Sequence, residues 1–232
     1  MMKLNEEQIR SIIATMEMNA EKQVEIFDKE LDNVINKLSP EGWTLPYELG
    51  IYAVKQIANT NKLDDINTFL KWYFTDEDYL HTKKMVQHIE NSSIKMGLKK
   101  LFGECWESFK DKRFAICANS LVSVIEGLLS EFNDNKNDIR MMKICQEKVD
   151  TFPEDGSTIQ KHAWISYNTF IRELYKKSDF TNEEPSSINR HWLLHGRSDY
   201  EIEELDCIRL INAVESLCII WNKENTNNNR GE

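Results

Sequence analysis

The sequence is poor in the residues that break regular structure. It has only 8 Gly and 4 Pro among 232 residues, whereas a β-sandwich or β-barrel needs a turn signal roughly every 8–12 residues. These architectures are therefore disfavoured, and helix is the expected structure. The fractions of hydrophobic residues (41%) and charged residues (29%) are ordinary for a globular protein.

Paired cysteines and long apolar segments are also lacking. The five cysteines are odd in number and form no C-x-x-C pair, which argues against a disulfide framework and a zinc ribbon. We expect them to be small, reduced and mostly buried. The first ten residues lack the apolar core of a signal peptide, and no apolar run approaches the roughly 18 residues of a membrane span. We expect a cytoplasmic protein with no membrane partner.

Positive charge is in deficit. With 39 acidic and 29 basic residues, the formal net charge is -10. A protein that holds nucleic acid by a general positive field is therefore excluded, and any such contact must be local. The stretch 161–197 is slightly basic, because it contains four acidic residues and six basic ones: Lys161, Arg172, Lys176, Lys177, Arg190 and Arg197.

What the chain does have is helical periodicity. Apolar residues recur at steps of three and four, as in amphipathic helices. The first helix is expected from Asn5 to about residue 38, with Gln8 completing a capping-box variant at its start and Pro40 stopping it. Further helices are expected at 45–57, 64–73, 77–90, 93–109, 114–132, 141–149, 157–175, 188–195 and 200–221.

These patterns predict an all-α protein in two parts. Residues 1–91 form an N-terminal helical region, and residues 92–222 form a helical bundle whose core helix is the very apolar stretch 114–132. Thr44 is the expected cap of the second helix. Residues 223–232 are too polar to offset their ordering entropy and are expected to be a disordered tail.

One short segment concentrates groups suited to chemistry. Residues 189–196 (N-R-H-W-L-L-H-G) hold two of the five histidines and an arginine. An imidazole can give or take a proton near neutrality, and a guanidinium can hold a phosphate oxygen. In RNA the 2′-hydroxyl is an internal nucleophile, so the protein need supply only proton transfer and charge stabilisation. If the segment is helical, His191 and His195 share one face beside Arg190.

Two other interpretations of this segment stay open. In the first, Arg190 and His191 are surface residues and His195 ends a helix before a Gly cap, favoured by the helix dipole. In the second, His191 and His195 bind zinc at i, i+4 spacing. The remaining ligands would then come from Asp199, Glu203 or Cys207. However, the residue after His191 is not the Glu of an H-E-x-x-H helix. We therefore expect no metal and no cofactor.

The motif at 190–195 resembles the signature of the HEPN superfamily, in which an Arg is followed by a polar residue and, a few positions later, by a His. The longer phrase 189–196 is similar to the N-R-H-x-x-L-H-G motif of a bacterial HEPN-like group. The segment 124–128 and the turn at 42–43 also look like that group. The resemblance covers residues 92–222 and implies a small all-α bundle.

The resemblance implies a metal-independent endoribonuclease. Arg190 would position the scissile phosphate and stabilise its charge, His195 would act as general acid or base, and His191 would assist both. The products would be a 2′,3′-cyclic phosphate and a 5′-hydroxyl. Such proteins commonly pair two motifs across a homodimer and act in toxin–antitoxin, abortive-infection and phage-defence systems. RNA and an antitoxin or regulatory protein are thus the expected partners.

Four further residues are expected to bind substrate: Asn189, Trp192, Arg197 and Glu126. Trp192 could stack on a base, although its place beside an apolar residue favours packing. Some HEPN domains are non-catalytic, so the alternative function is a binding or dimerisation module for a partner protein or nucleotide. An ion pair that buries Arg190 favours the module, whereas an Arg190 and a His195 that open to one cleft across a two-fold axis favour the nuclease.

Overall fold

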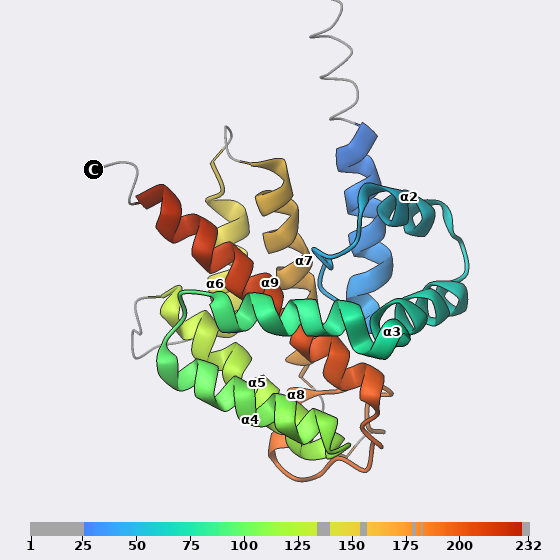
Figure 1. Cartoon of the computed structure of the whole chain (residues 1–232), viewed down its shortest axis with the longest axis vertical. Coiled ribbons are helices and arrows are strands. Elements are labelled where there is room, and N and C mark those ends of the chain that lie inside the picture. Colours follow the sequence, from blue (N-terminus) through green and yellow to red (C-terminus); the bar gives the residue numbers. More distant parts are fainter. Residues whose placement is uncertain (1–25, 134–139, 154–156, 178–179, 182, 229–232) are drawn as a thin grey trace, which may run out of the picture.

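The protein is all-α, as predicted (Figure 1). The computed structural model describes residues 26–133, 140–153, 157–177, 180–181 and 183–228, and no strand occurs among them. Residues 26–38 are helical. The elements that follow are η1 (Ser39–Glu41), α2 (Ile51–Asn59), α3 (Leu63–Asn91), α4 (Met96–Lys110), α5 (Phe114–Glu131), α6 (Met141–Asp150), α7 (Thr158–Leu174), α8 (Arg190–Leu194) and α9 (Glu204–Asn228).

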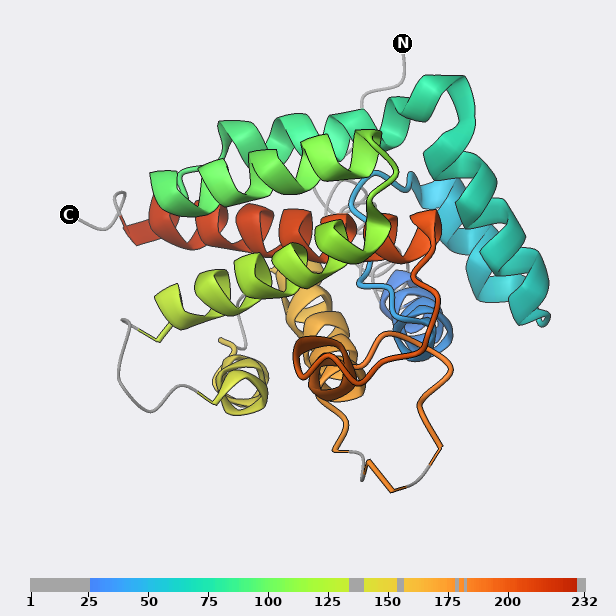
Figure 2. The ribbon, with the colours of Figure 1, turned by 90° about the horizontal axis from the view of Figure 1, so that it is seen from below.

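Helix α9 lies at the centre of the arrangement. It packs against α3, α5 and α7, and α5 packs in turn against α4. In Figure 2 the second half of α3, together with α4, α5 and α9, runs across the view, whereas α6, α7 and residues 26–38 are seen nearly end-on. From residue 206 to residue 220, all side chains of α9 are buried except Arg209 and Ile219. The bundle is therefore built around one nearly enclosed helix.

The hydrophobic core crosses the expected boundary between residues 91 and 92. One cluster of buried residues extends from Leu31 to Ile220 and includes side chains of every long helix. Trp43 has no exposed surface and stacks on Phe74 with ring centroids 5.3 Å apart. The guanidinium of Arg209, on α9, lies 5.7 Å from the Trp43 ring. The N-terminal region thus shares its core with the rest of the protein.

The segment between η1 and α2 corrects one prediction. A helix was expected from residue 45, but residues 43–50 are not helical and α2 begins at Ile51. Thr44 does not cap it. Instead, the Asn212 amide donates to the Thr44 carbonyl (3.0 Å) and hydroxyl (2.7 Å), and the Ser216 hydroxyl lies 2.8 Å from that hydroxyl. These buried contacts with α9 hold the segment in an irregular conformation that local propensity does not reveal.

Helix α3 is interrupted near the expected break between residues 73 and 77. Glu77, Asp78 and Tyr79 have φ values of 47°, 55° and 61°, in the left-handed region, which costs a non-Gly residue about 1–2 kcal/mol. The interruption is held by side chains, because Tyr79 donates a 2.5 Å hydrogen bond to Glu204. Tyr79 also meets the ring of Phe109 edge-on, with centroids 5.7 Å apart.

The C-terminal end of α9 corrects a second prediction. Residues from 223 onward were expected to be disordered, but α9 continues to Asn228. Glu224 accepts hydrogen bonds from Lys148 (2.7 Å) and from the indole of Trp164 (3.3 Å), which ties this polar turn to α6 and α7. The cap predicted at Asn5 and Gln8, the loop at 134–138 and the last four residues of the tail lie outside the described residues.

Helix α5 corrects a third expectation. By length and composition, Phe114–Glu131 is apolar enough to cross a membrane, although no such stretch was anticipated. Half of this helix is buried in the bundle, where it packs between α4 and α9. It is therefore the core helix that its periodicity predicts. The five cysteines are all buried and unbridged, as expected.

The central role of α5 can be tested by comparing its two faces. Leu121 is fully buried and Ile116 is 54% exposed. We expect Leu121→Ala to lower the free energy of unfolding by about 2–5 kcal/mol, because it leaves a cavity in the core. The matched control Ile116→Ala should change it by no more than about 0.5 kcal/mol. Urea denaturation followed by circular dichroism measures both, and equal losses would contradict the assigned faces.

Candidate functional site

The backbone of the motif is set by Asn189, which begins α8. The Asn189 side-chain oxygen accepts from the backbone amides of His191 (3.0 Å) and Trp192 (3.4 Å), as an N-cap residue does. Its amide donates to the carbonyl of Lys176 (2.8 Å), and the residue is only 4% exposed. Asn189 therefore positions the motif, and its polar atoms are engaged within the protein.

The other end of α8 is fixed by packing and by a glycine. Trp192 and Leu193 are buried, and Trp192 meets the ring of Phe180 edge-on with centroids 5.2 Å apart. Gly196 follows the helix at a φ of 62°, the left-handed conformation in which Gly commonly ends a helix. The predicted short helix and its Gly stop are thus confirmed, and the burial of Trp192 fits packing rather than base stacking.

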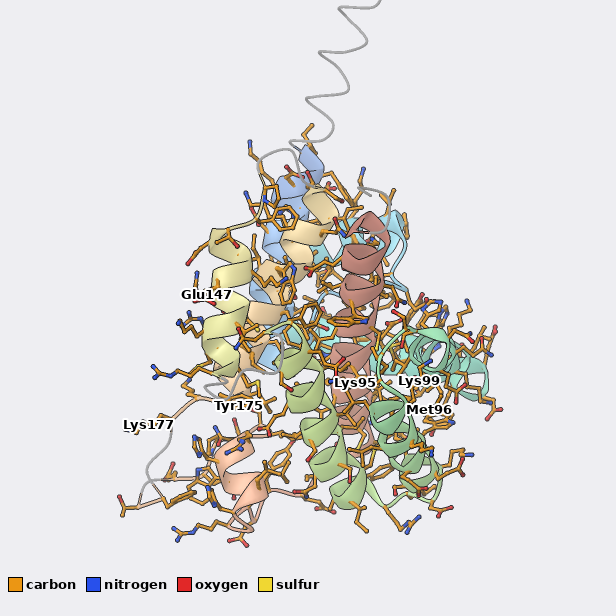
Figure 3. All side chains as sticks on the ribbon, turned by 90° about the vertical axis from the view of Figure 1, so that its left-hand side faces the viewer. Lys95, Met96, Lys99, Glu147, Tyr175 and Lys177 are labelled. Atoms are coloured by element: carbon orange, nitrogen blue, oxygen red, sulfur yellow. The ribbon has the colours of Figure 1, made fainter. Side chains whose placement is uncertain are left out.

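Arg190 is paired with Glu126 of α5. The Arg190 Nε donates a 2.9 Å hydrogen bond to Glu126 Oε1, and both side chains are about one quarter exposed. The hydroxyl of Tyr175, at the end of α7, donates to the same oxygen (2.5 Å), and the Arg190 guanidinium lies 5.6 Å from the Tyr175 ring. Figure 3 shows Tyr175 next to α8. One carboxylate thereby joins α5, α7 and α8.

Burial and hydrogen bonding determine the protonation states of Tyr175 and Arg190. Burial, with the hydrogen bond and charge of Glu126, raises the pKa of Tyr175 well above its usual value, so its hydroxyl remains protonated and donates. Burial lowers the pKa of Arg190, but the hydrogen bond and negative charge of Glu126 outweigh this effect and raise it overall. Arg190 is therefore a permanent cation whose charge is partly neutralised by Glu126.

The two histidines form a second group. Their rings are nearly parallel, with 9° between the planes and 6.1 Å between the centroids, and His195 is exposed. Phe180 meets His195 edge-on at 5.8 Å, and the Arg197 guanidinium lies 4.3 Å from the Phe180 ring. The predicted one-face placement of the histidines is therefore present, with a cation nearby that is not paired with Glu126.

The structure thus divides the predicted residues between two groups of contacts. Glu126 belongs with Arg190, while Arg197 and Trp192 belong with the histidines through Phe180. Within the described ranges, no hydrogen bond or ion pair joins the Arg190 guanidinium to either imidazole ring. Tyr175 and Phe180 were missed by sequence reasoning, because neither stands in the motif and their aromatic character alone marks no site.

In the part of the chain that the structure describes, His191 and His195 belong to no group of three potential metal ligands. Among the described residues, the group of three potential ligands whose donor atoms lie within 4.8 Å of one another is Glu48, His88 and Glu215, which contains neither His191 nor His195. Cys207, one of the ligands considered, is fully buried. No signal in the sequence marked the other group, because its members are far apart along the chain.

Comparisons with known proteins add no identification. No protein-family model matches the chain, and no curated protein or solved structure is significantly similar to it. The function must therefore be argued from the chemistry of the site itself.

The capping role of Asn189 can be measured directly. We expect Asn189→Ala to lower the free energy of unfolding by about 1–2 kcal/mol, because it removes the cap and the hydrogen bond to the Lys176 carbonyl. The variant Asn189→Ser keeps a capping oxygen and should lose less. Thermal and urea denaturation give both values. A serine variant no more stable than the alanine variant would contradict the assigned cap.

Proposed function

We propose that the protein is a metal-independent endoribonuclease that cleaves RNA by attack of the 2′-hydroxyl on the adjacent phosphate. The observation that carries this proposal is the nearly parallel pair formed by His191 and His195, whose ring centroids are 6.1 Å apart. Both histidines lie within five residues of Arg190 in the chain. Two imidazoles can act as the base and the acid of one phosphodiester cleavage, and a cation stabilises the charge that develops on the phosphate.

The proposed reaction needs no further reactant. One imidazole, assigned to His195, takes the proton of the 2′-hydroxyl as the 2′-oxygen bonds to phosphorus. The bond from phosphorus to the 5′-oxygen breaks, and the leaving oxygen receives a proton from the other imidazole, assigned to His191. The products are a 2′,3′-cyclic phosphate and a 5′-hydroxyl. The exchange of a proton between the two rings after product release restores the site.

Arg190 is proposed to hold the scissile phosphate. A guanidinium carries five N–H groups, and the hydrogen bond to Glu126 occupies the one on Nε. The remaining groups can donate to phosphate oxygens while Glu126 and Tyr175 keep the side chain oriented. Arg197, held over Phe180 beside His195, adds a second cation for the RNA backbone. These local charges are needed because the chain as a whole carries a charge of -10 and repels RNA.

The likeness of the motif to HEPN proteins extends the proposal to a biological setting. It favours a cytoplasmic toxin or phage-defence nuclease that acts as a homodimer, with two motifs facing one another, and that is controlled by an antitoxin or another regulatory protein. This setting rests on the motif alone.

A second candidate is favoured by the ion pair of Arg190. With its charge partly neutralised by Glu126 and Tyr175 stacked nearby, Arg190 could serve to fix α8 onto the bundle. The protein would then be a non-catalytic module that binds a partner protein or a nucleotide through the same surface. This candidate predicts that loss of Arg190 lowers stability without an effect on RNA.

The nuclease is tested with labelled total RNA in the presence of EDTA. We expect the wild-type protein to leave cyclic phosphate ends, and we expect His195→Ala and Arg190→Ala each to lower the rate roughly 100-fold or more. Arg113→Ala is a matched control, because Arg113 also pairs with a carboxylate, that of Asp111 at 2.9 Å, but lies outside the site. All variants should first show wild-type helical content.

Two outcomes would count against this function. Equal cleavage by wild-type protein and by Arg190→Ala would show that the activity comes from elsewhere. An absence of cleavage, together with binding of a nucleotide or a partner protein that His195→Ala abolishes, would support the module instead.

A further inference from the structure

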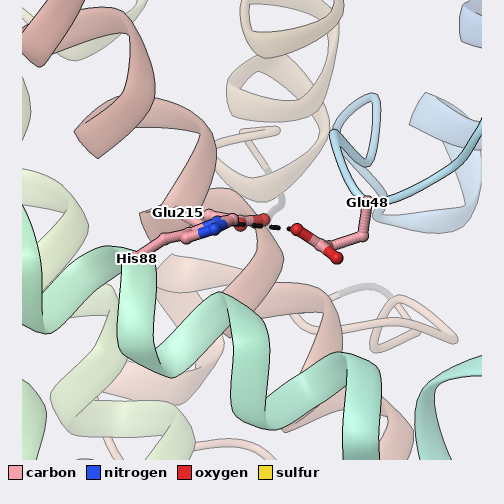
Figure 4. A group of neighbouring side chains, drawn as sticks. All are labelled: Glu48, His88 and Glu215. Atoms are coloured by element: carbon pink, nitrogen blue, oxygen red, sulfur yellow. Dashed lines mark hydrogen bonds and ion pairs between the residues drawn. The ribbon is translucent and has the colours of Figure 1, made fainter.

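A second cluster of chemically active side chains lies away from α8. Glu48 comes from the segment before α2, His88 from α3 and Glu215 from α9, and the three side chains converge (Figure 4). The His88 Nδ1 lies 2.6 Å from Glu215 Oε1 and 3.5 Å from Glu48 Oε1. The three donor atoms all lie within 4.8 Å of one another. Two carboxylates and an imidazole thus meet at one point.

The buried carboxylate of Glu215 is incompletely satisfied. Its side chain has no exposed surface, and among the described residues its Oε2 has no hydrogen-bond partner. The hydroxyl of Tyr47 is likewise enclosed without a partner among these residues. An enclosed carboxylate normally requires an ion partner or several hydrogen bonds. One half-exposed histidine meets only part of this requirement.

The donor set suits a divalent transition metal. Imidazole nitrogen and carboxylate oxygen are both ligands of zinc, which takes three protein ligands and a water in open sites, with bonds of about 2.0–2.2 Å. The exposed edge of His88, whose side chain is 49% accessible, leaves room for that water. The other oxygen of Glu48 faces away from the cluster, toward His81 and Lys84, each 4.0 Å distant.

The geometry requires only a small adjustment. In a tetrahedral zinc site, bonds of about 2.0–2.1 Å place neighbouring donor atoms roughly 3.4 Å apart. The separation between His88 and Glu48 is already 3.5 Å, whereas that between His88 and Glu215 is 2.6 Å and must widen. A rotation of the half-exposed His88 ring widens this separation without a movement of the buried Glu215.

We propose that Glu48, His88 and Glu215 bind one divalent transition-metal ion, for which zinc is the probe. The ion would supply the positive charge that the buried carboxylate lacks. It would also tie the segment before α2 to α3 and α9. The proposal does not rest on the nuclease function, because the two sites share no residue.

The experiment is a calorimetric titration of the untagged, chelator-treated and desalted protein with zinc chloride. We expect one equivalent to bind, and we expect Glu215→Gln and His88→Gln each to weaken binding roughly tenfold or more. His162→Gln is the matched control, because His162 also lies beside a carboxylate, 3.2 Å from Asp32, but pairs with no second one within the described part of the chain. Zinc should raise the melting temperature of the wild type and of the control only.

The possible results separate the alternatives. An absence of binding through the micromolar range would overturn the proposal, and so would binding that is lost in His191→Gln or His195→Gln but retained in His88→Gln. If Glu215→Gln does not fold, the His88→Gln variant decides the question, because the side chain at this position is half exposed and the glutamine amide can still donate a hydrogen bond to Glu215. RNA cleavage in EDTA is scored separately, so failure of one proposal leaves the other measurable.

Discussion

The burial of α9 on nearly every side is the constraint on which the rest of the structure depends. A helix enclosed in this way is apolar over most of its circumference, and the buried polar side chains on it need partners inside the protein. Asn212 and Ser216 form hydrogen bonds with Thr44, and one oxygen of Glu215 bonds to His88. The position of the irregular segment before α2 and the facing side of α3 therefore both follow from polar residues on α9. Their placement in turn determines where α2 can begin.

Local sequence signals predicted the fold well, because most helices of this protein bury one stripe of apolar residues. The all-α class, the core helix at 114–132, the short helix before Gly196 and the burial of the cysteines are all recovered from spacing and composition. The two errors in helix boundaries share one physical cause. The irregular segment at 43–50 and the last turns of α9 are stabilised by polar contacts with residues far away in the chain, such as the bond between Lys148 and Glu224. A local pattern contains no trace of such a partner.

In the candidate site, too, the features set by local spacing were predictable and those set by long-range contacts were not. The histidine pair follows from i, i+4 spacing on a short helix, so the sequence was sufficient to predict it. The orientation of Arg190 depends on Glu126, 64 residues earlier, and on Tyr175 at the end of another helix. Glu126 could be recognised as a polar residue at the edge of an apolar face, but its partner could not. The cluster of Glu48, His88 and Glu215 is the extreme case, because His88 and Glu215 are 127 residues apart and no motif links them.

The hydrogen bonds between Thr44 and Asn212 also bear on the order in which the protein folds during its synthesis. The two residues are 168 positions apart, so the segment that contains Trp43 leaves the ribosome long before its partner helix exists. Contacts of such high sequence separation slow folding and leave apolar surface exposed in the meantime. The nascent chain must therefore carry the uncovered indole of Trp43 and the faces of α3 and α5 until α9 emerges. The stage most exposed to aggregation or chaperone capture is thus the one just before α9 is released.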